Sequence, residues 1–150
     1  MNTEAKRKLA TKIAMHFVGT PYIWGGDDPI RGFDCLGFVI EVLKSVGILP
    51  RNGDWTASGL WDKFNRHIAN SPYMGCLVFF RAREQYNSPI IHVEYCIDGV
   101  HTIGASGGGS ATNNINDAIK QNAYIKIRPI NKDRWIEGYL DPFGGQKTEH

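Results

Sequence analysis

The apolar pattern of the chain changes at residues 70–72, and this change limits the folds that are open to it. Before residue 70, apolar side chains recur every three or four residues, the spacing of helices with one buried face. After residue 72, short runs rich in β-branched and aromatic residues alternate with turn-forming residues, which is typical of strands. Helices followed by a mostly antiparallel sheet predict an α+β domain.

The helices are placed by this spacing and by residues that start or end them. They are predicted over residues 4–18, about 35–46 and 56–68, with a helical turn over 117–122. Gly19 ends the first helix, and either Thr56 or Ser58 caps the third, because a hydroxyl oxygen accepts a hydrogen bond from a free N–H group at a helix start.

The strands follow in the second half of the chain. They are predicted over residues 77–81, 90–97, 100–105 and 124–129. The dipeptide Asp98-Gly99 predicts a two-residue hairpin turn between the second and third strands. No long linker divides the chain, so we predict one domain over residues 1–150, with residues 1–4 and 144–150 frayed.

Composition and charge argue against several classes of protein. With 150 residues, 42% of them hydrophobic, the chain can bury a core of its own. The net charge is only +2 and the basic residues are scattered, which does not predict a nucleic-acid partner. No apolar run approaches the length of a membrane span, and the N-terminal residues do not resemble a signal peptide. The delivery route is therefore left open between a removed leader, another export route and retention in the cell.

One of the three cysteines differs from the other two. An odd number argues against a disulfide scaffold, and without a Cys-x-x-Cys pair we predict no metal site and no cofactor. Cys76 and Cys96 lie in strand-like runs, where cysteine usually acts as a small buried hydrophobe. Cys35 instead follows a loop rich in glycine and opens a predicted helix. The free N–H groups and partial positive charge of a helix N-terminus favour the thiolate, so we predict that Cys35 is a nucleophile.

A cysteine nucleophile needs a base, and His92 is the best candidate among the histidines. His16 and His67 lie near the ends of predicted helices as solvated cations, and His150 is terminal. His92 is an abrupt polar position early in an apolar strand-like run. The alternative is a core histidine bonded to a backbone carbonyl. With a poised cysteine elsewhere in the chain, we predict that His92 is the base.

Four motifs follow one another in a fixed order. They are Tyr-x-Trp-Gly-Gly at residues 22–26, Gly-Phe-Asp-Cys-x-Gly at 32–37, Leu-Val-Phe-Phe at 77–80 and His-Val at 92–93. In order and spacing they resemble the NlpC-type cysteine peptidases, papain-like hydrolases of bacterial cell-wall peptides. The resemblance runs from about residue 14 to 129. It implies a papain-like domain in which N-terminal helices pack on a small antiparallel sheet, with the cysteine at a helix N-terminus and the histidine on the sheet.

The resemblance also implies roles for individual residues. Cys35 matches the nucleophile and His92 the base. Tyr22 matches a tyrosine whose hydroxyl helps to stabilise the oxyanion. Asp34 matches an acidic residue that contacts the substrate or the neighbouring loop. Trp24 lines either the cleft, where it would bind substrate, or the core, and both possibilities stay open.

The group that orients the histidine is the least defined part of the predicted site. In the family, a third polar residue on the next strand bonds the far nitrogen of the histidine. Alignment through the predicted hairpin makes His92 face Gly104, which has no side chain. Strand alternation puts Thr102 and Ser106 on the same side and His101 on the other. We therefore predict a Cys–His dyad oriented by a backbone carbonyl or by Ser106, with His101 as the alternative if the register slips by one residue.

Three further positions depart from the family pattern. Leu36 replaces a common serine, so a preference for a free N-terminal alanine is not supported. Cys76 replaces a usual aspartate, and Glu94 replaces a common glycine two residues after the histidine.

The resemblance implies a cysteine hydrolase that cleaves amide bonds in peptidoglycan stem peptides, often between D-glutamate and a diamino acid. It would act on the cell wall as a secreted enzyme, a phage protein or an antibacterial effector. Two alternatives stay open. One is a catalytically impaired wall-binding or phage structural module on the same fold, and the other is an acyltransferase or amidase with the same Cys–His pair. The bond that is cleaved and the oligomeric state are not predicted.

Overall fold

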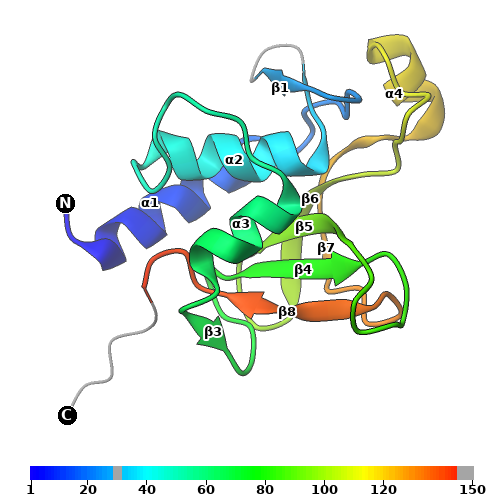
Figure 1. Ribbon diagram of the computed structural model, residues 1–150. Coiled ribbons are helices and arrows are strands. Elements are labelled where there is room, and N and C mark those ends of the chain that lie inside the picture. Colours follow the sequence, from blue (N-terminus) through cyan, green and yellow to red (C-terminus); the bar gives the residue numbers. More distant parts are fainter. Residues whose placement is uncertain (29–31, 145–150) are drawn as a thin grey trace.

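The computed structural model describes residues 1–28 and 32–144, which form helices and a twisted antiparallel sheet (Figure 1). The helices are α1 (Thr3–His16), α2 (Cys35–Ser45), α3 (Ala57–Phe64) and α4 (Ile115–Gln121). The strands are β1 (Asp27–Asp28), β2 (Gly32–Phe33), β3 (Ile68–Ala69), β4 (Leu77–Arg81), β5 (Ile90–Cys96), β6 (His101–Ser106), β7 (Tyr124–Pro129) and β8 (Ile136–Leu140). The predicted α+β class, with helices first and an antiparallel sheet after them, is confirmed.

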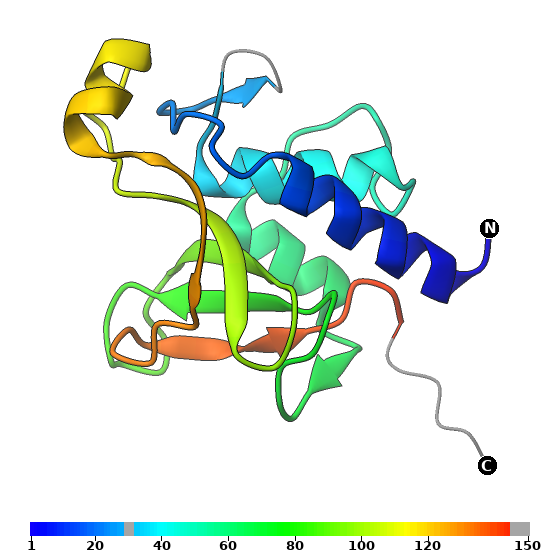
Figure 2. The same cartoon turned by 180° about the vertical axis from the view of Figure 1, so that it is seen from behind.

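The main sheet has six strands in the order β3-β8-β4-β5-β6-β7, while β1 and β2 form a small separate ribbon. Figures 1 and 2 show α1, α2 and α3 together on one side of this sheet, with α4 set apart from them. Helix α2 contacts β5 and β6, and α1 packs against α2. Among the described residues, no helix combines the length and the apolarity that a bilayer crossing requires.

Both faces of the central strands are buried, because successive residues of a strand point to opposite sides. Phe79, Val93 and Tyr95 belong to the core that the helices cover. Phe80 and Cys96 belong to a second, smaller cluster on the other face, which also includes Cys76. Both cysteines are fully buried, as predicted for small apolar residues.

The structure describes the N-terminal residues for which the sequence predicts fraying, and that prediction stays untested. Helix α1 begins at Thr3, and the side chain of Asn2 accepts a 2.8 Å hydrogen bond from the N–H group of Ala5. This cap satisfies one of the free N–H groups of the first turn, which orders the end of the helix. Thr56 caps α3 in the same way. Fraying is also predicted for residues 144–150, of which 145–150 lie outside the described residues.

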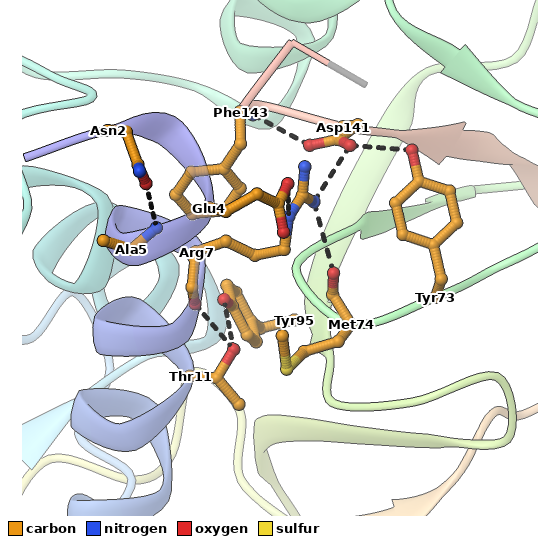
Figure 3. Close-up of polar contacts among 10 residues, drawn as sticks. All are labelled: Asn2, Glu4, Ala5, Arg7, Thr11, Tyr73, Met74, Tyr95, Asp141 and Phe143. Carbon is orange, nitrogen blue, oxygen red and sulfur yellow. Dashed lines mark hydrogen bonds and ion pairs between the residues drawn. The ribbon is translucent and has the colours of Figure 1, made fainter. Parts of the chain in front are cut away.

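Helix α1 is tied to the far end of the sheet by Arg7 (Figure 3). The Arg7 guanidinium lies 2.9 Å from the carboxylate of Asp141, which directly follows β8, and 3.1 Å from Glu4. It also donates to the backbone oxygen of Met74, and the Tyr73 hydroxyl donates to Asp141 at 2.7 Å. Arg7 is 2% exposed and Asp141 is fully buried, so this is a buried ion pair with hydrogen-bonded partners.

Strands β1, β2, β3 and β8 were not predicted, and the predicted extension of the third helix to residue 68 is wrong, because α3 ends at Phe64 and Ile68 pairs with Leu140 in the sheet. In β8 only Leu140 is buried, so the alternation of buried and exposed residues that marks a strand is missing. β8 forms because β4 offers it a free edge, along which Leu77 pairs with Leu140. β3 in turn pairs with β8.

The hairpin between β5 and β6 differs from the prediction by one residue. The N–H group of Ile97 donates to the oxygen of His101, so the loop contains residues 98–100 rather than two residues. The Asp98 side chain accepts hydrogen bonds from the N–H groups of Val100 and His101 and stabilises this longer loop. Cys96 consequently pairs with Thr102 and Tyr95 with Ile103. This register brings Gly104 against Glu94, not against His92.

Candidate active site

Cys35 is the first residue of α2 and is half-buried, as the loop-to-helix pattern predicts. The carboxylate of Asp34 caps the helix by accepting a 2.6 Å hydrogen bond from the N–H group of Gly37. A Cβ atom on residue 37 would lie 2.1 Å from the carbonyl oxygen of Gly26, so only glycine lets the preceding loop approach the first turn of the helix. The Asp-Cys-x-Gly spacing therefore builds the platform that presents the thiol.

Tyr22 lies beside this platform on a loop held by backbone hydrogen bonds. Its N–H group donates to Ala123, and the next N–H group, that of Ile23, donates to Phe33. Burial, followed by the negative charges of Cys35 and Asp34, raises the pKa of Tyr22 to about 12. The Tyr22 hydroxyl consequently keeps its proton near neutral pH and is a hydrogen-bond donor there.

His92 lies in β5 and bridges Cys35 and Glu94. Its Nε2 atom is 2.5 Å from Oε2 of Glu94, and the imidazole also has a side-chain hydrogen bond with Cys35. With Nε2 directed at the carboxylate, Nδ1 is the nitrogen left to face the thiol. Burial alone lowers the pKa of His92, but the hydrogen bonds and negative charges of Cys35 and Glu94 outweigh it and raise the pKa to about 9. The imidazole is therefore held as the protonated form next to the sulfur.

Five of the predicted site residues share one groove of about 440 Å³, whereas Asp34 and Gly104 are not among the residues that line it. Its walls include Tyr22, Trp24, Cys35, His92, Ser106, residues 107–109, Arg128 and Arg134. Trp24 is 55% exposed, which decides between the two possibilities left open by the sequence: it lines the groove and is not part of the core. The groove is open to solvent, so a peptide can reach the thiol.

The orienting group of His92 differs from the prediction. Ser106 lines the groove, but the far nitrogen of His92 is bonded by Glu94, not by Ser106 or a backbone carbonyl. Gly104 lies next to the side chain of Glu94 and contributes no side chain of its own. His101 lies at the hairpin loop, where its Nδ1 atom is 3.1 Å from Asp98, so the alternative of a slipped register that turns His101 toward the site is wrong.

Glu94 is the residue that sequence reasoning missed. Its Oε1 atom accepts a 2.6 Å hydrogen bond from the Thr102 hydroxyl, and its Oε2 atom is 3.3 Å from Arg128. Burial raises the pKa of Glu94, but the contacts with His92, Thr102 and Arg128 outweigh it and lower the pKa to about 2. The signal was present in the sequence, because a residue two positions after His92 on a strand shares its face.

Asp34 has a structural role that the sequence did not reveal, since its carboxylate is the cap of α2. Burial raises its pKa, while the hydrogen bonds from Gly37 and Gly25 oppose this shift. Contact of Asp34 with substrate stays a prediction. Within residues 1–28 and 32–144, no three His, Cys, Asp or Glu side chains are grouped so that they could hold a metal ion.

A thiol at a helix N-terminus, bonded to a histidine on an antiparallel sheet in an open groove, defines the site of a papain-like cysteine hydrolase. Residues 19–135 match the model of the NlpC/P60 family. The chain therefore belongs to the NlpC/P60 family, in agreement with the resemblance of its motifs.

Two curated relatives carry the names of peptidases. The chain is 34% identical over 122 residues to the probable peptidoglycan endopeptidase LytE of Bacillus subtilis. This alignment covers 81% of the chain and 32% of the relative. It is 33% identical over 126 residues to a gamma-D-glutamyl-L-lysine dipeptidyl-peptidase of Bacillus cereus. That alignment covers 82% of the chain and 32% of the relative. The chain thus spans about a third of the length of these two relatives.

Solved structures support the fold. The peptidoglycan hydrolase RipB of Mycobacterium tuberculosis superposes with a TM-score of 0.68 at 20% identity, over 94% of this chain and 66% of that protein. An NlpC/P60 family protein from Bacillus cereus gives a TM-score of 0.65 at 24% identity, over 89% of this chain and 38% of that protein.

Proposed function

We propose that this chain is a cysteine endopeptidase of peptidoglycan stem peptides that cleaves the amide bond between D-glutamate and the following diamino acid. The observation that carries the proposal is the hydrogen bond between Cys35 and His92 in a groove that is open to solvent. The names of the relatives supply the substrate class, and the cell wall is accordingly the proposed place of action.

The first chemical step forms a thioester. The Cys35 thiolate attacks the carbonyl carbon of the scissile amide, and the carbonyl oxygen becomes an oxyanion. The Tyr22 hydroxyl and the N–H group of Cys35 donate hydrogen bonds to this oxyanion. The His92 imidazolium then gives its proton to the amide nitrogen, the C–N bond breaks, and the amine product leaves.

The second step releases the acyl group. With the amine gone, neutral His92 takes a proton from a water molecule, which attacks the thioester carbonyl carbon. The C–S bond breaks, the acyl product leaves as a carboxylic acid, and Cys35 is again a thiolate beside the His92 imidazolium. A full cycle thus consumes one water molecule and leaves the protein unchanged.

Digestion of defined muropeptides tests this function. We expect mass spectrometry to find fragments cut between D-glutamate and the diamino acid, with one water added. His92→Ala should lower cleavage by roughly 10²- to 10⁴-fold, the usual contribution of a positioned acid–base group. The matched control is His101→Ala, which removes a partly exposed histidine paired with Asp98 and should retain activity. Intact muropeptides after prolonged digestion, or products carrying an added amine in place of water, would contradict the proposal.

Two arginines suit the groove to an anionic peptide. Arg128 and Arg134 both line it, and Cζ of Arg134 lies 4.8 Å from the centre of the Phe80 ring. That ring is 5.4 Å from the imidazole of His92, so the Arg134 guanidinium lies close to the catalytic pair. A D-glutamate joined through its side chain keeps a free α-carboxylate near the scissile bond. We propose that Arg134 pairs with this carboxylate, because guanidinium and carboxylate form strong charge-assisted hydrogen bonds.

Removing the Arg134 charge should weaken substrate binding more than it slows the reaction. For Arg134→Ala we expect KM to rise roughly 10- to 100-fold with kcat changed little, since a hydrogen bond to a charged group contributes roughly 1.5–3 kcal/mol. The same variant should show almost no effect on a peptide whose α-carboxylate is amidated. Lys132→Ala is the matched control, because it removes an exposed charge from the same loop without touching the groove. An equal loss on both peptides would argue against the assignment.

A further inference from the structure

We propose that Glu94 is the positioning residue of His92, supplied by the histidine's own strand instead of the neighbouring one, and that Gly104 leaves the space it needs. This inference rests on the proposed function, in which His92 is the acid–base residue. It goes beyond that function because it assigns the third member of the site to a position where the sequence pattern had placed none.

The geometry of Glu94 suits this role. One carboxylate oxygen is 2.5 Å from Nε2 of His92, and the other accepts a 2.6 Å hydrogen bond from Thr102. Arg128 lies 3.3 Å from the first oxygen. The carboxylate is 2% exposed, so water competes little for these bonds. Glu94 is thus fixed on two sides and fixes the ring of His92 in turn, which keeps Nδ1 directed toward Cys35.

Gly104 is the counterpart of this arrangement on β6. A Cβ atom on residue 104 would lie 2.8 Å from Cγ of Glu94 and 3.2 Å from Cδ. Side-chain atoms do not approach that closely, so any larger residue at 104 would displace the carboxylate from His92. Glu94 and Gly104 therefore form a compensating pair, in which the carboxylate occupies the volume that a polar residue on β6 would otherwise fill.

A carboxylate in this place has a consequence that a neutral polar residue would not have. Five charged or titratable groups lie around His92 and Glu94. Three of them are Cys35 of α2, Tyr22 of the loop before α2 and Glu94 itself. The other two are Arg128 of β7, which contacts Glu94, and Arg134, which lies over the Phe80 ring next to His92. Arg128 and Arg134 oppose a positive imidazole, whereas Glu94 and Cys35 favour it. Because the contact with Glu94 is direct and buried, the imidazolium persists to about pH 9, where its pKa lies.

The decisive variant is Glu94→Gln, which keeps the shape of the side chain and removes its charge. We expect the ring of His92, followed by NMR, to lose its proton at a clearly lower pH than in the wild type. The alkaline limb of kcat/KM should move down with it, toward the ordinary histidine pKa of about 6.5. kcat should fall on the order of 10²-fold at neutral pH. Glu137→Gln, which removes the partner of Arg81 outside the groove, is the matched control and should shift neither curve.

A double-mutant cycle tests the pairing with Gly104. Gly104→Ala should lower kcat/KM in the wild type, because the methyl group displaces Glu94. In the Glu94→Ala background the same substitution should cost little, since the space is then free. Thermal melting followed by circular dichroism verifies that each variant is folded. Independent, multiplying losses would contradict the compensating pair.

Two outcomes separate this inference from the proposed function. If Glu94→Gln leaves the titration of His92 unchanged, Glu94 does not position the histidine, whatever the variant does to stability. If the wild type cleaves no muropeptide but the titration still shifts, the proposed substrate is wrong and the positioning role of Glu94 is supported.

Discussion

Cys35→Ala is expected to abolish peptide cleavage without unfolding the protein. Every covalent step of the proposed mechanism passes through the Cys35 sulfur, so its removal should lower kcat/KM by roughly 10⁴-fold or more. The side chain is half-buried at the lip of the groove and caps no helix, so the free energy of unfolding should change by less than about 1 kcal/mol. Purified peptidoglycan, digested and analysed by mass spectrometry, is the substrate for this measurement.

Alkylation of the wild type provides an independent check of Cys35. Iodoacetamide reacts with thiolates, and Cys35 is the cysteine that lines the groove beside His92. Cys76 and Cys96 are fully buried, and burial raises the pKa of both thiols, that of Cys76 to about 11. Peptide mapping should therefore find rapid labelling at Cys35 and almost none at the other two. Cleavage by Cys35→Ala, or equal labelling of all three cysteines, would refute the assignment of the nucleophile.

Asp141→Ala is expected to produce the largest loss of stability. The substitution leaves the guanidinium of Arg7 buried without the carboxylate that lies 2.9 Å from it, and it also removes the acceptor of the Tyr73 hydroxyl (Figure 3). Breaking a buried pair in this way costs about 3–5 kcal/mol. For a chain of 150 residues this corresponds to a fall in Tm of roughly 10 °C, measurable by calorimetry.

A double replacement distinguishes the lost pair from lost packing. Arg7→Met combined with Asp141→Leu removes both charges and keeps apolar volume, so it should be less destabilising than Asp141→Ala alone. Neither residue lines the groove, so kcat should be unchanged at temperatures where the variants are folded. If the double variant is the less stable one, the network contributes more through its hydrogen bonds than through the pairing of the Arg7 and Asp141 charges.

Local sequence patterns were sufficient to predict the elements that carry Cys35 and His92. The run of glycines before Cys35 and the apolar helix after it place the thiol at the start of α2. Their interactions span only a few residues, such as the cap of Asp34 on Gly37. The same holds for His92, whose position early in a β-rich run was visible without any partner strand. Helix caps and strand patterns depend on neighbouring residues, so one sequence contains enough information to predict them.

The register of β5 and β6 was beyond such reasoning. The Asp98-Gly99 dipeptide favours a two-residue turn, but the structure has three residues in the loop because the Asp98 side chain bonds two successive N–H groups. The predicted pairing of His92 with Gly104 differs by two positions from the observed register, in which Tyr95 pairs with Ile103 and Cys96 with Thr102. With the predicted register Gly104 faces His92, and the site has no third side chain. With the observed register it faces Glu94, and the carboxylate fills the space.

The sequence by itself determined the succession of helices and then an antiparallel sheet, the helix start that carries Cys35 and the strand that carries His92. The tertiary structure decided that Glu94 bonds the histidine, that β8 joins the sheet and that Arg7 meets Asp141 across 134 positions of the chain. The physical reason is the distance along the sequence over which each kind of interaction acts. Propensity, capping and periodicity act between near neighbours, whereas hydrogen bonds between strands and buried ion pairs depend on which distant segments the packed core brings into contact.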